Sequence, residues 1–435
     1  MKDFGAYRDI AFSAPGAVRE VQERLLRGHV AHCGSNSPYY RRVLSKEGVD
    51  PDAVTLEGLR FLPFTRKRDF ERWNDDFLAA PPESIVDIVL SSGTTGVPTR
   101  IMYTESDLCR LAYNEEKSFA ACGLGPRDVV LLTCTMDRCF IAGLAYFLGL
   151  RSLGAAVVRN GLNSVESHVE ILGRMRPTAI VGVPSFLKKL ALHMVERGLD
   201  PGAAPPSRLI CIGEPVRGPD FELLEVGDFL QRTWRAEIFS TYASSETVTS
   251  FCECGAGRGG HLHPDLGIVE IVDEEGAILS PGKTGEIVLT PLGVEGMPLL
   301  RFKTGDVGFL VDEPCACGRF TPRLGPILGR KKQMMKVRGT TVYPQAIYSV
   351  LEEIPAVTDY YLVVERESPL SDSVTVFAAV KDSSCTPGVI ADRLQARLRV
   401  RPKVVLADGE AVRGRVYAAD SRKPVLFNDR RRKPC

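Results

Sequence analysis

The sequence predicts an α/β protein in which helices flank mostly parallel sheets. From residue 84 onward, short runs rich in β-branched residues alternate with helical patterns, and this alternation is typical of βαβ units. After residue 260 no helical pattern separates the strands, which are joined by turns such as SPGKTG. We therefore expect a large N-terminal domain at 1–330, with a small, mainly β, barrel-like subdomain at 260–330, followed by a small mobile α+β domain at 331–435.

The expected elements begin with an amphipathic helix over 18–33, whose apolar face packs on the core. The run SIVDIVL (84–90) is interpreted as a buried strand, and a helix is expected near 105–120. The next expected strands cover 127–134, 154–160, 178–184, 208–213 and 236–243, and the helices between them cover 141–154, 164–176, 185–198 and 221–234. Three more strands are expected at 267–273, 285–292 and 306–312.

Composition excludes several classes of function. The chain has 55 basic and 54 acidic residues among 435, so no excess of charge favours nucleic acid or a membrane surface as a partner. Its start has neither an apolar signal-peptide core nor the Arg-rich bias of a transit peptide, and no apolar run is long enough to span a membrane. We therefore expect a cytoplasmic protein.

The loop LSSGTTGVPTR (90–100) is a candidate phosphate site, because glycines allow close backbone approach while hydroxyls and N–H groups surround an anion. It is not a Walker A motif, because Gly96 is followed by Val97 and Pro98. An ordinary surface turn has the same composition, so the loop alone does not decide. Polar loops also follow two expected strands, at GEP (213–215) and YASSE (242–246), where ligands of parallel sheets gather.

Six motifs occur in order along the chain: SSGTTG (91–96), GEP (213–215), YASSE (242–246), RFKTGD (301–306), GRKKQMMKVRG (329–339) and SRKPVLFNDR (421–430). Their order and spacing resemble the adenylate-forming superfamily, and most closely the phenylacetate-CoA ligase family. The segments NSPYYRRVL, LPFTRKRDF and VYPQAI resemble further parts of that family, so the resemblance covers nearly the whole chain. It implies an enzyme that adenylates a carboxylic acid with ATP and Mg²⁺, releases pyrophosphate and transfers the acyl group to CoA.

The resemblance implies roles for individual residues. Thr94 and Thr95 would cover the β- and γ-phosphates, Glu246 would hold Mg²⁺, and Tyr242 would stack on adenine. Alternatively, Glu246 interacts with backbone N–H groups at a helix start, and Tyr242 packs in the core. The residues implied to bind nucleotide or acceptor are Ser91, Ser92, Gly93, Thr94, Thr95, Gly96, Gly213, Glu214, Pro215, Tyr242, Ala243, Ser244, Ser245, Glu246, Asp306, Arg330 and Gly339.

Other implied roles fall in the C-terminal part. Lys423 would stabilise the adenylation transition state, although a lysine in a basic tail is otherwise solvated. Asp306 would accept hydrogen bonds from the ribose hydroxyls, the alternative being an Asx turn. Arg330 would contact the nucleotide from the hinge at 329–333, about which the domain carrying Gly339 would rotate for thioester formation.

Two C-x-C pairs stand out among the 12 cysteines: CEC at 252–254, followed by HLH at 261–263, and CAC at 315–317. Thiols and imidazoles fit a closed tetrahedral zinc site. The resemblance to some phenylacetate-CoA ligases selects, as ligands of a structural zinc, Cys254, His261, Cys315 and Cys317. In an alternative set Cys252 or His263 replaces one of these, and buried thiols beside a loop histidine would need no metal.

Three functions are compatible with the sequence. The leading one is an AMP-forming ligase that joins an aryl or arylacetic acid to CoA. The second is an adenylating enzyme whose acceptor is a carrier-protein thiol or an amine, and the third is a non-catalytic nucleotide-binding relative. Val97 and the basic hinge (Lys331, Lys332) depart from the family pattern, so the non-catalytic function remains an alternative. The segment 133–143 is expected to shape the acid pocket, and the resemblance implies that two chains pair through the large domain.

Overall fold

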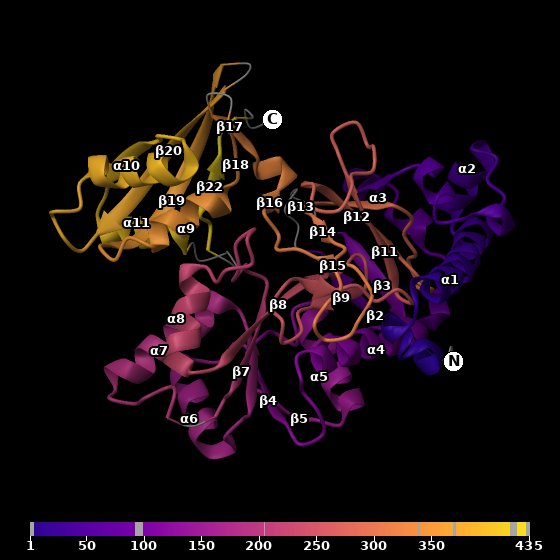
Figure 1. Ribbon diagram of the computed structural model, residues 1–435, viewed down its shortest axis with the longest axis horizontal. Coiled ribbons are helices and arrows are strands. Elements are labelled where there is room, and N and C mark those ends of the chain that lie inside the picture. Colours follow the sequence, from indigo (N-terminus) through magenta and orange to yellow (C-terminus); the bar gives the residue numbers. More distant parts are fainter. Residues whose placement is uncertain are drawn as a thin grey trace. The chain divides into compact units, whose positions relative to one another are not determined.

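The computed structural model describes residues 4–91, 99–203, 205–337, 340–368, 371–417 and 424–431 (Figure 1). The chain divides into two compact units. The N-terminal unit comprises Met1–Thr304 and Gly308–Ile327, and the C-terminal unit comprises Gly305–Val307 and Leu328–Cys435. Within the described residues, no helix is both long and apolar enough to cross a membrane.

A six-stranded sheet forms the centre of the N-terminal unit (Figure 1). Its strands, in spatial order, are β5 (Ala156–Arg159), β4 (Val129–Leu132), β6 (Ala179–Gly182), β7 (Arg208–Ile212), β8 (Glu237–Ser244) and β9 (Thr249–Cys252). All neighbours are parallel except β8 and β9. The predicted α/β class is therefore confirmed.

Helices cover both faces of this sheet, because its strands are apolar on both sides. Leu132 and Val181 pack against Phe119 and Tyr146 on one face, whereas Leu131 packs with residues of three other helices on the opposite face. The first pair of helices is α4 (Glu105–Ala121) and α5 (Ala142–Leu153), and the other three are α6 (Val165–Met175), α7 (Pro184–Glu196) and α8 (Glu225–Trp234).

The strand predicted at 84–90 is present, but the prediction that it is buried is wrong. Strand β2 (Ile85–Leu90) forms a two-stranded antiparallel sheet with β3 (Arg100–Thr104), outside the central sheet. Val86 and Ile88 are 53% and 51% exposed, whereas Val89 on the opposite side is buried. Because side chains alternate between the faces of a strand, a β-branched run can be apolar on both faces while only one is covered.

The N-terminal segments add α1 (Pro15–Asn36), α2 (Pro38–Lys46), β1 (Thr65–Arg66) and α3 (Lys67–Arg72). Short 3₁₀ helices also lie here, at Phe4–Tyr7, Ile10–Phe12, Pro51–Ala53, Gly58–Phe61, Asn74–Phe77 and Pro82–Ser84, and another, Lys331–Gln333, lies in the C-terminal unit. Strand β1 joins the second large sheet in the order β1-β13-β12-β11, made with β13 (Phe302–Gly308), β12 (Gly285–Pro291) and β11 (Gly267–Val272). A three-stranded sheet follows, with β10 (Gly260–His261), β15 (Arg323–Leu324) and β14 (Leu310–Val311).

Arg301, the first residue of RFKTGD, joins the N-terminal segments to this second sheet. Its buried guanidinium forms two bonds with the Glu270 carboxylate, of 3.0 and 2.8 Å. It also donates to the carbonyl oxygens of Arg60 and Leu62, at 2.6 and 2.8 Å. A buried charge is tolerated when it is paired and hydrogen-bonded in this way, so this motif residue has a structural role.

The C-terminal unit is built on a four-stranded sheet in the order β21-β20-β19-β22. These strands are β21 (Lys403–Leu406), β20 (Ser371–Val380), β19 (Val357–Ser368) and β22 (Phe427–Asp429). Its helices are α9 (Pro344–Glu352), α10 (Pro387–Leu398) and α11 (Gly409–Val416), and shorter strands are β16 (Gly329–Arg330), β17 (Met335–Val337) and β18 (Thr340–Val342). Leu362, Val376, Ile390 and Leu394 form part of one apolar core between sheet and helices.

Glu115 on α4 gives the fold a pH dependence. Burial raises the pKa of its carboxyl to about 7. The ordinary pKa of this carboxyl is 4.5, so between pH 4.5 and about pH 7 the folded state keeps a proton that the unfolded state releases. The free energy of unfolding therefore falls as pH rises through this range. We expect Glu115→Gln to raise the free energy of unfolding at pH 8 by about 3 kcal/mol and to have little effect at pH 4.5. Urea denaturation at both pH values checks this, and an equal effect at both would contradict it.

Candidate active site and metal cluster

Ser91 lies at the base of the expected phosphate loop. Its backbone N–H donates to the Thr99 carbonyl at 2.9 Å, and its Oγ accepts from the Thr99 N–H at 3.1 Å. These bonds hold together the two ends of the segment between Ser91 and Thr99. The other loop residues predicted to bind phosphate lie outside the described residues: Ser92, Gly93, Thr94, Thr95 and Gly96.

The expected acid-pocket segment contacts the same loop base. The N–H of Leu90 donates to the carbonyl of Cys139 at 2.9 Å. Arg138 and Cys139 have φ angles of 61° and 53°, so this segment turns tightly without glycine. Ile141 is buried in a core cluster, and Met136 packs against another. The structure therefore places 133–143 next to Ser91.

The GEP motif follows β7, as predicted, whereas YASSE begins inside the adjacent parallel strand β8. Its first three residues end β8 and pair with β9, so only Ser245 and Glu246 lie beyond the strand. Ile212 of β7 is the register partner of Thr241 of β8, which places Gly213 beside Tyr242. Gly213 has φ 74°, a conformation that glycine adopts without strain. The Glu214 carboxylate accepts from the N–H and Oγ of Ser185 at the start of α7, both at 2.9 Å, so it caps that helix.

Glu246 has two side-chain partners. Its Oε1 lies 3.2 Å from Nζ of Lys67, and its Oε2 accepts from Ser244 Oγ at 2.9 Å. Its side chain is 14% exposed, which leaves it accessible from solvent. Tyr103 fixes the same turn, because its hydroxyl donates to the Ser245 carbonyl at 2.9 Å. One such carboxylate fits Mg²⁺, which binds few protein oxygens and keeps several waters.

Lys67 was not among the predicted site residues. It is the first residue of α3, directly after β1, and lies in the segment LPFTRKRDF that carried part of the resemblance. Nothing in the local pattern distinguishes this lysine from its basic neighbours, because its contact with Glu246 joins residues 179 positions apart. It brings a positive charge to the side chain expected to hold Mg²⁺.

Asp306 and Arg330 belong to the C-terminal unit and lie opposite each other. They are register partners on β13 and β16, and Arg330 Nε lies 3.4 Å from Asp306 Oδ1. Asp306 is thus part of a strand. The Arg330 side chain is 49% exposed, so the ion pair itself contributes little stability. Gly339 and Lys423 lie outside the described residues.

The structure brings four predicted zinc ligands together. The ligand atoms of Cys254, His261, Cys315 and Cys317 all lie within 4.8 Å of one another. Cys254 Sγ is 3.6 Å from Cys315 Sγ, and Cys317 Sγ is 3.3 Å from His261 Nε2. Zinc–sulfur bonds of about 2.3 Å at the tetrahedral angle separate two sulfurs by about 3.8 Å, and a sulfur from an imidazole nitrogen by about 3.5 Å. The donor set and its spacing therefore fit zinc.

The two alternative ligands have other partners. Cys252 Sγ lies 3.0 Å from Cys122 Sγ and accepts from Thr241 Oγ1 at 3.1 Å. His263 is buried, with Nε2 3.2 Å from Ser118 Oγ. Among the described residues, the cluster that could hold a metal thus comprises Cys315, Cys317, Cys254 and His261.

The protonation states in the cluster suit a metal. Burial, together with the positive charges of Arg319 and Arg323, lowers the pKa of His261 to about 3, so its imidazole is neutral at pH 7. Burial raises the pKa of Cys254 to about 12. Burial also raises the pKa of Cys317, but hydrogen bonds from the backbone and side chain of Arg319 have the larger effect. The pKa of Cys317 is therefore lowered. Neutral imidazole is the ligating form of histidine, and a metal would supply the charge that stabilises the thiolates.

Glu253 connects this cluster to the GEP and YASSE motifs. In the sequence, Glu253 stands between Cys252 and Cys254. Its side chain is 2% exposed. Oε2 accepts from Arg217 Nε at 3.0 Å and from the N–H of Ser240 at 2.9 Å. Arg217 follows Pro215 closely, and Ser240 precedes Tyr242 on β8. Glu253, which is adjacent to the cluster residue Cys254, is thus bonded to residues that lie close in sequence to both motifs.

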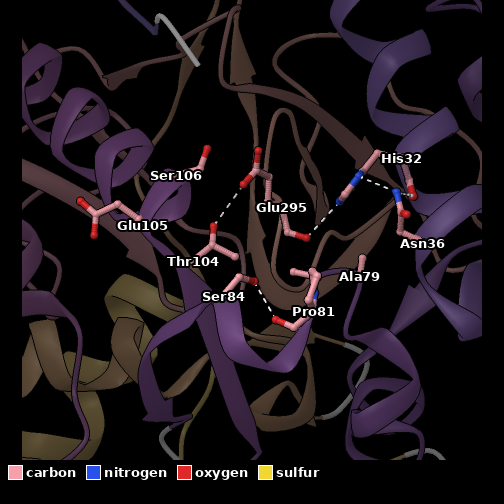
Figure 2. Close-up of a pocket in the computed structure, with 10 residues that line it drawn as sticks. His32, Asn36, Ala79, Pro81, Ser84, Thr104, Glu105, Ser106 and Glu295 are labelled. Carbon is pink, nitrogen blue, oxygen red and sulfur yellow. Dashed lines mark hydrogen bonds between the residues drawn. The ribbon is translucent and has the colours of Figure 1, made fainter. Parts of the chain in front are cut away.

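A separate pocket of about 430 Å³ opens between the end of α1 and the start of α4 (Figure 2). His32, Thr104 and Glu295 line it with other residues. Thr104 Oγ1 donates to Glu295 Oε2 at 3.3 Å, and His32 Nε2 lies 3.0 Å from the Glu295 carbonyl oxygen. None of the predicted site residues lines this pocket.

Comparisons with known proteins agree with this architecture. Residues 37–294 match the family of AMP-binding enzymes. The phenylacetate-coenzyme A ligase of Thermus thermophilus is 35% identical over 363 residues, which cover 82% of this chain and 80% of that protein. The Escherichia coli protein of the same name is 28% identical over 380 residues, covering 85% of this chain and 84% of that protein. The crystal structure of 2-hydroxyisobutyryl-CoA ligase in complex with R3-HIB-AMP has the same fold, with a TM-score of 0.80 and 22% identity over 96% of this chain and 88% of that one.

Proposed function

Because the chain belongs to the family of AMP-binding enzymes, we propose that it is an ATP-dependent ligase that activates an aryl or arylacetic acid as its acyl-adenylate and transfers the acyl group to CoA. The observation that carries the proposal is the extent of the similarity to phenylacetate-coenzyme A ligases, which covers 82% of this chain. The polar loops after β7 and β8 support it, since ligands of parallel sheets bind at the carboxyl ends of strands.

The chemistry needs positioned donors and charge. The acid carboxylate attacks the α-phosphorus of ATP, the bond to pyrophosphate breaks, and negative charge grows on the phosphate oxygens. The CoA thiolate then attacks the carbonyl carbon of the mixed anhydride, and AMP leaves. Mg²⁺, when bound, neutralises part of the phosphate charge. Glu246 would hold it, and Lys67, 3.2 Å from this carboxylate, adds a fixed positive charge.

The remaining roles extend those implied by the motifs. Tyr242 and the GEP backbone flank adenine, the hydroxyls of Thr94 and Thr95 contact the phosphates, and Asp306 binds the ribose. Lys423 supplies a cation to the α-phosphate in the adenylation transition state. Ser244, which donates to Glu246 Oε2 at 2.9 Å, fixes that carboxylate.

The acid is proposed to bind beside the loop base. Segment 133–143 approaches Leu90 through the Cys139 carbonyl, and Phe140 in this segment offers an aromatic surface that is not fully buried. Arg138 and Asp137 are exposed there, with 3.9 Å between Nε and Oδ1. They provide polar groups for a ring substituent.

The function is tested by pyrophosphate release from ATP and Mg²⁺ across aryl, arylacetic and short aliphatic acids, each with and without CoA. We expect release with at least one aromatic acid and formation of its CoA thioester. Release without any use of CoA would favour a carrier-protein thiol or an amine as acceptor. No release with any acid would contradict the proposed function.

We predict about one structural zinc per chain, held by the four clustered side chains. Metal analysis of protein purified without chelator should find it, and Cys254→Ser or Cys315→Ser should lose the metal and lower the unfolding temperature. Cys139→Ser is the matched control, because Cys139 is an exposed thiol outside the cluster, and it should keep the zinc. Wild-type protein that contains no zinc would contradict the prediction.

A cytoplasmic location, Mg²⁺ dependence and pairing of two chains through the large domain are further proposals. The location is the expectation from the sequence, and the other two follow from the family relationship. Sedimentation analysis tests the pairing directly.

A further inference from the structure

Arg431 makes an unusually complete set of contacts inside the C-terminal unit. Its side chain is 9% exposed. Nε and Nη2 donate to the two carboxylate oxygens of Asp429, at 2.9 and 2.7 Å. Nη1 donates to Asp372 Oδ2 at 3.0 Å and to the Met334 carbonyl at 2.6 Å, and Nη2 also donates to the Lys332 carbonyl at 3.0 Å. A guanidinium has five N–H donors, and each of these has an acceptor.

One of these acceptors lies in the expected hinge and a second lies directly after it. Lys332 lies in the segment 329–333, Met334 follows it, and the C-terminal unit resumes at Leu328. Asp372, whose side chain is 2% exposed, also accepts from the N–H of Lys336 at 2.9 Å. Arg431 and Asp372 together therefore hold the chain from Lys332 to Lys336.

Asp429, the other acceptor of Arg431, lies with Arg431 in the C-terminal segment that follows Lys423. In this segment β22 pairs in parallel with β19, so that Phe427 is the partner of Leu362. Val425 donates its N–H to the Val416 carbonyl at 2.8 Å. The first described residue of the segment, Pro424, comes directly after Lys423 in the sequence.

We propose that Arg431 is a positioning residue for adenylation: it fastens the segment that follows Lys423 to the hinge, so that both move as one body. This inference rests on the proposed function and adds a residue that acts through Lys423. Strand β22 fixes the segment to its own sheet, whereas the bonds to Lys332 and Met334 fix it to the hinge. Lysine cannot replace arginine here, because an ammonium has three donors and no planar fork.

The test separates the two half-reactions in Arg431→Gln and Arg431→Lys. We expect the kcat of acid-dependent pyrophosphate release to fall about 10- to 100-fold, with the KM for ATP changed less than about threefold, because a small misplacement of a catalytic group has this effect. Thioester formation from a synthetic acyl-adenylate should change less than about threefold. The matched control is Arg430→Gln, since Arg430 is 58% exposed and lies 3.5 Å from the exposed Glu365; it should behave as wild type.

Hydrogen exchange distinguishes positioning from a general loss of structure. In the Arg431 variants, peptides covering 328–337 and 424–431 should exchange faster, while peptides of β19 and β20 keep their protection. The proposal would be overturned if the Arg431 variants kept wild-type rates in both half-reactions. It would also be overturned if both half-reactions slowed equally, or if peptides of β20 lost their protection from exchange. Wild-type protein that releases no pyrophosphate with any acid would instead contradict the proposed function. Hydrogen exchange in the Arg431 variants would still show whether Arg431 holds the segment 424–431 to the hinge.

Discussion

Replacing Lys423 with alanine is expected to slow acyl-adenylate formation about 100- to 1,000-fold while thioester formation from a synthetic adenylate stays within about threefold of wild type. The reason is that negative charge grows on the α-phosphate oxygens in the first step, where a positioned ammonium stabilises the transition state. In the second step the phosphate leaves as AMP, and the acceptor is a thiolate. Acid-dependent pyrophosphate release and acyl-CoA formation measure the two steps separately.

Arg422→Ala is the matched control for this lysine. It removes one positive charge from the adjacent position of the same basic segment, so a general effect of charge would appear in both variants. We expect Arg422→Ala to stay within about threefold of wild type in both steps, since the motif implies no catalytic role for this arginine. Full adenylation activity in Lys423→Ala would remove this lysine from the mechanism.

Replacing Glu246 with glutamine should lower the rate of adenylation about 100-fold and raise the Mg²⁺ concentration that gives half-maximal rate. Glutamine keeps the shape and accepts a hydrogen bond from Ser244, but it removes the charge that attracts Mg²⁺ and Lys67. Titration of Mg²⁺ at saturating ATP and acid checks this, with the initial rate of pyrophosphate release as the readout.

The control for this variant is Glu237→Gln at the opposite end of β8. Glu237 is 70% exposed and lies 3.7 Å from Arg208, so losing its charge should leave the Mg²⁺ dependence unchanged. An unchanged Mg²⁺ dependence in Glu246→Gln would show that this carboxylate only pairs with Lys67. In that case Mg²⁺ would be held by the phosphates alone.

Local patterns predicted much of the fold because the strands of the central sheet are apolar on both faces. Leu131 and Leu132, adjacent in sequence, pack on opposite faces, so the whole run is apolar and easily recognised. The same reasoning failed at β2, where Val86 and Ile88 are exposed. An apolar run does not indicate which of its faces another element will cover.

The candidate active site was predictable where its residues form contiguous motifs, whereas the four clustered metal ligands were predictable only through the family resemblance. GEP follows β7 and YASSE covers the end of the neighbouring strand β8, so their proximity follows from the order of elements. The contact of Lys67 with Glu246 depends on β1 joining a sheet formed by residues beyond 260, which no local pattern specifies. Arg431 illustrates the same limit, because its acceptors at Lys332 and Met334 are nearly 100 positions away, at separations of 99 and 97 residues.

The most direct test of the central claim is quantification of nucleotide and thioester products after incubation with ATP, Mg²⁺, CoA and the aromatic acid that gives the fastest pyrophosphate release. We predict equal amounts of AMP and of the acyl-CoA thioester of that acid, with no product when the acid is omitted. ADP in place of AMP, or AMP without any acyl-CoA, would contradict the assignment as an AMP-forming acid–CoA ligase.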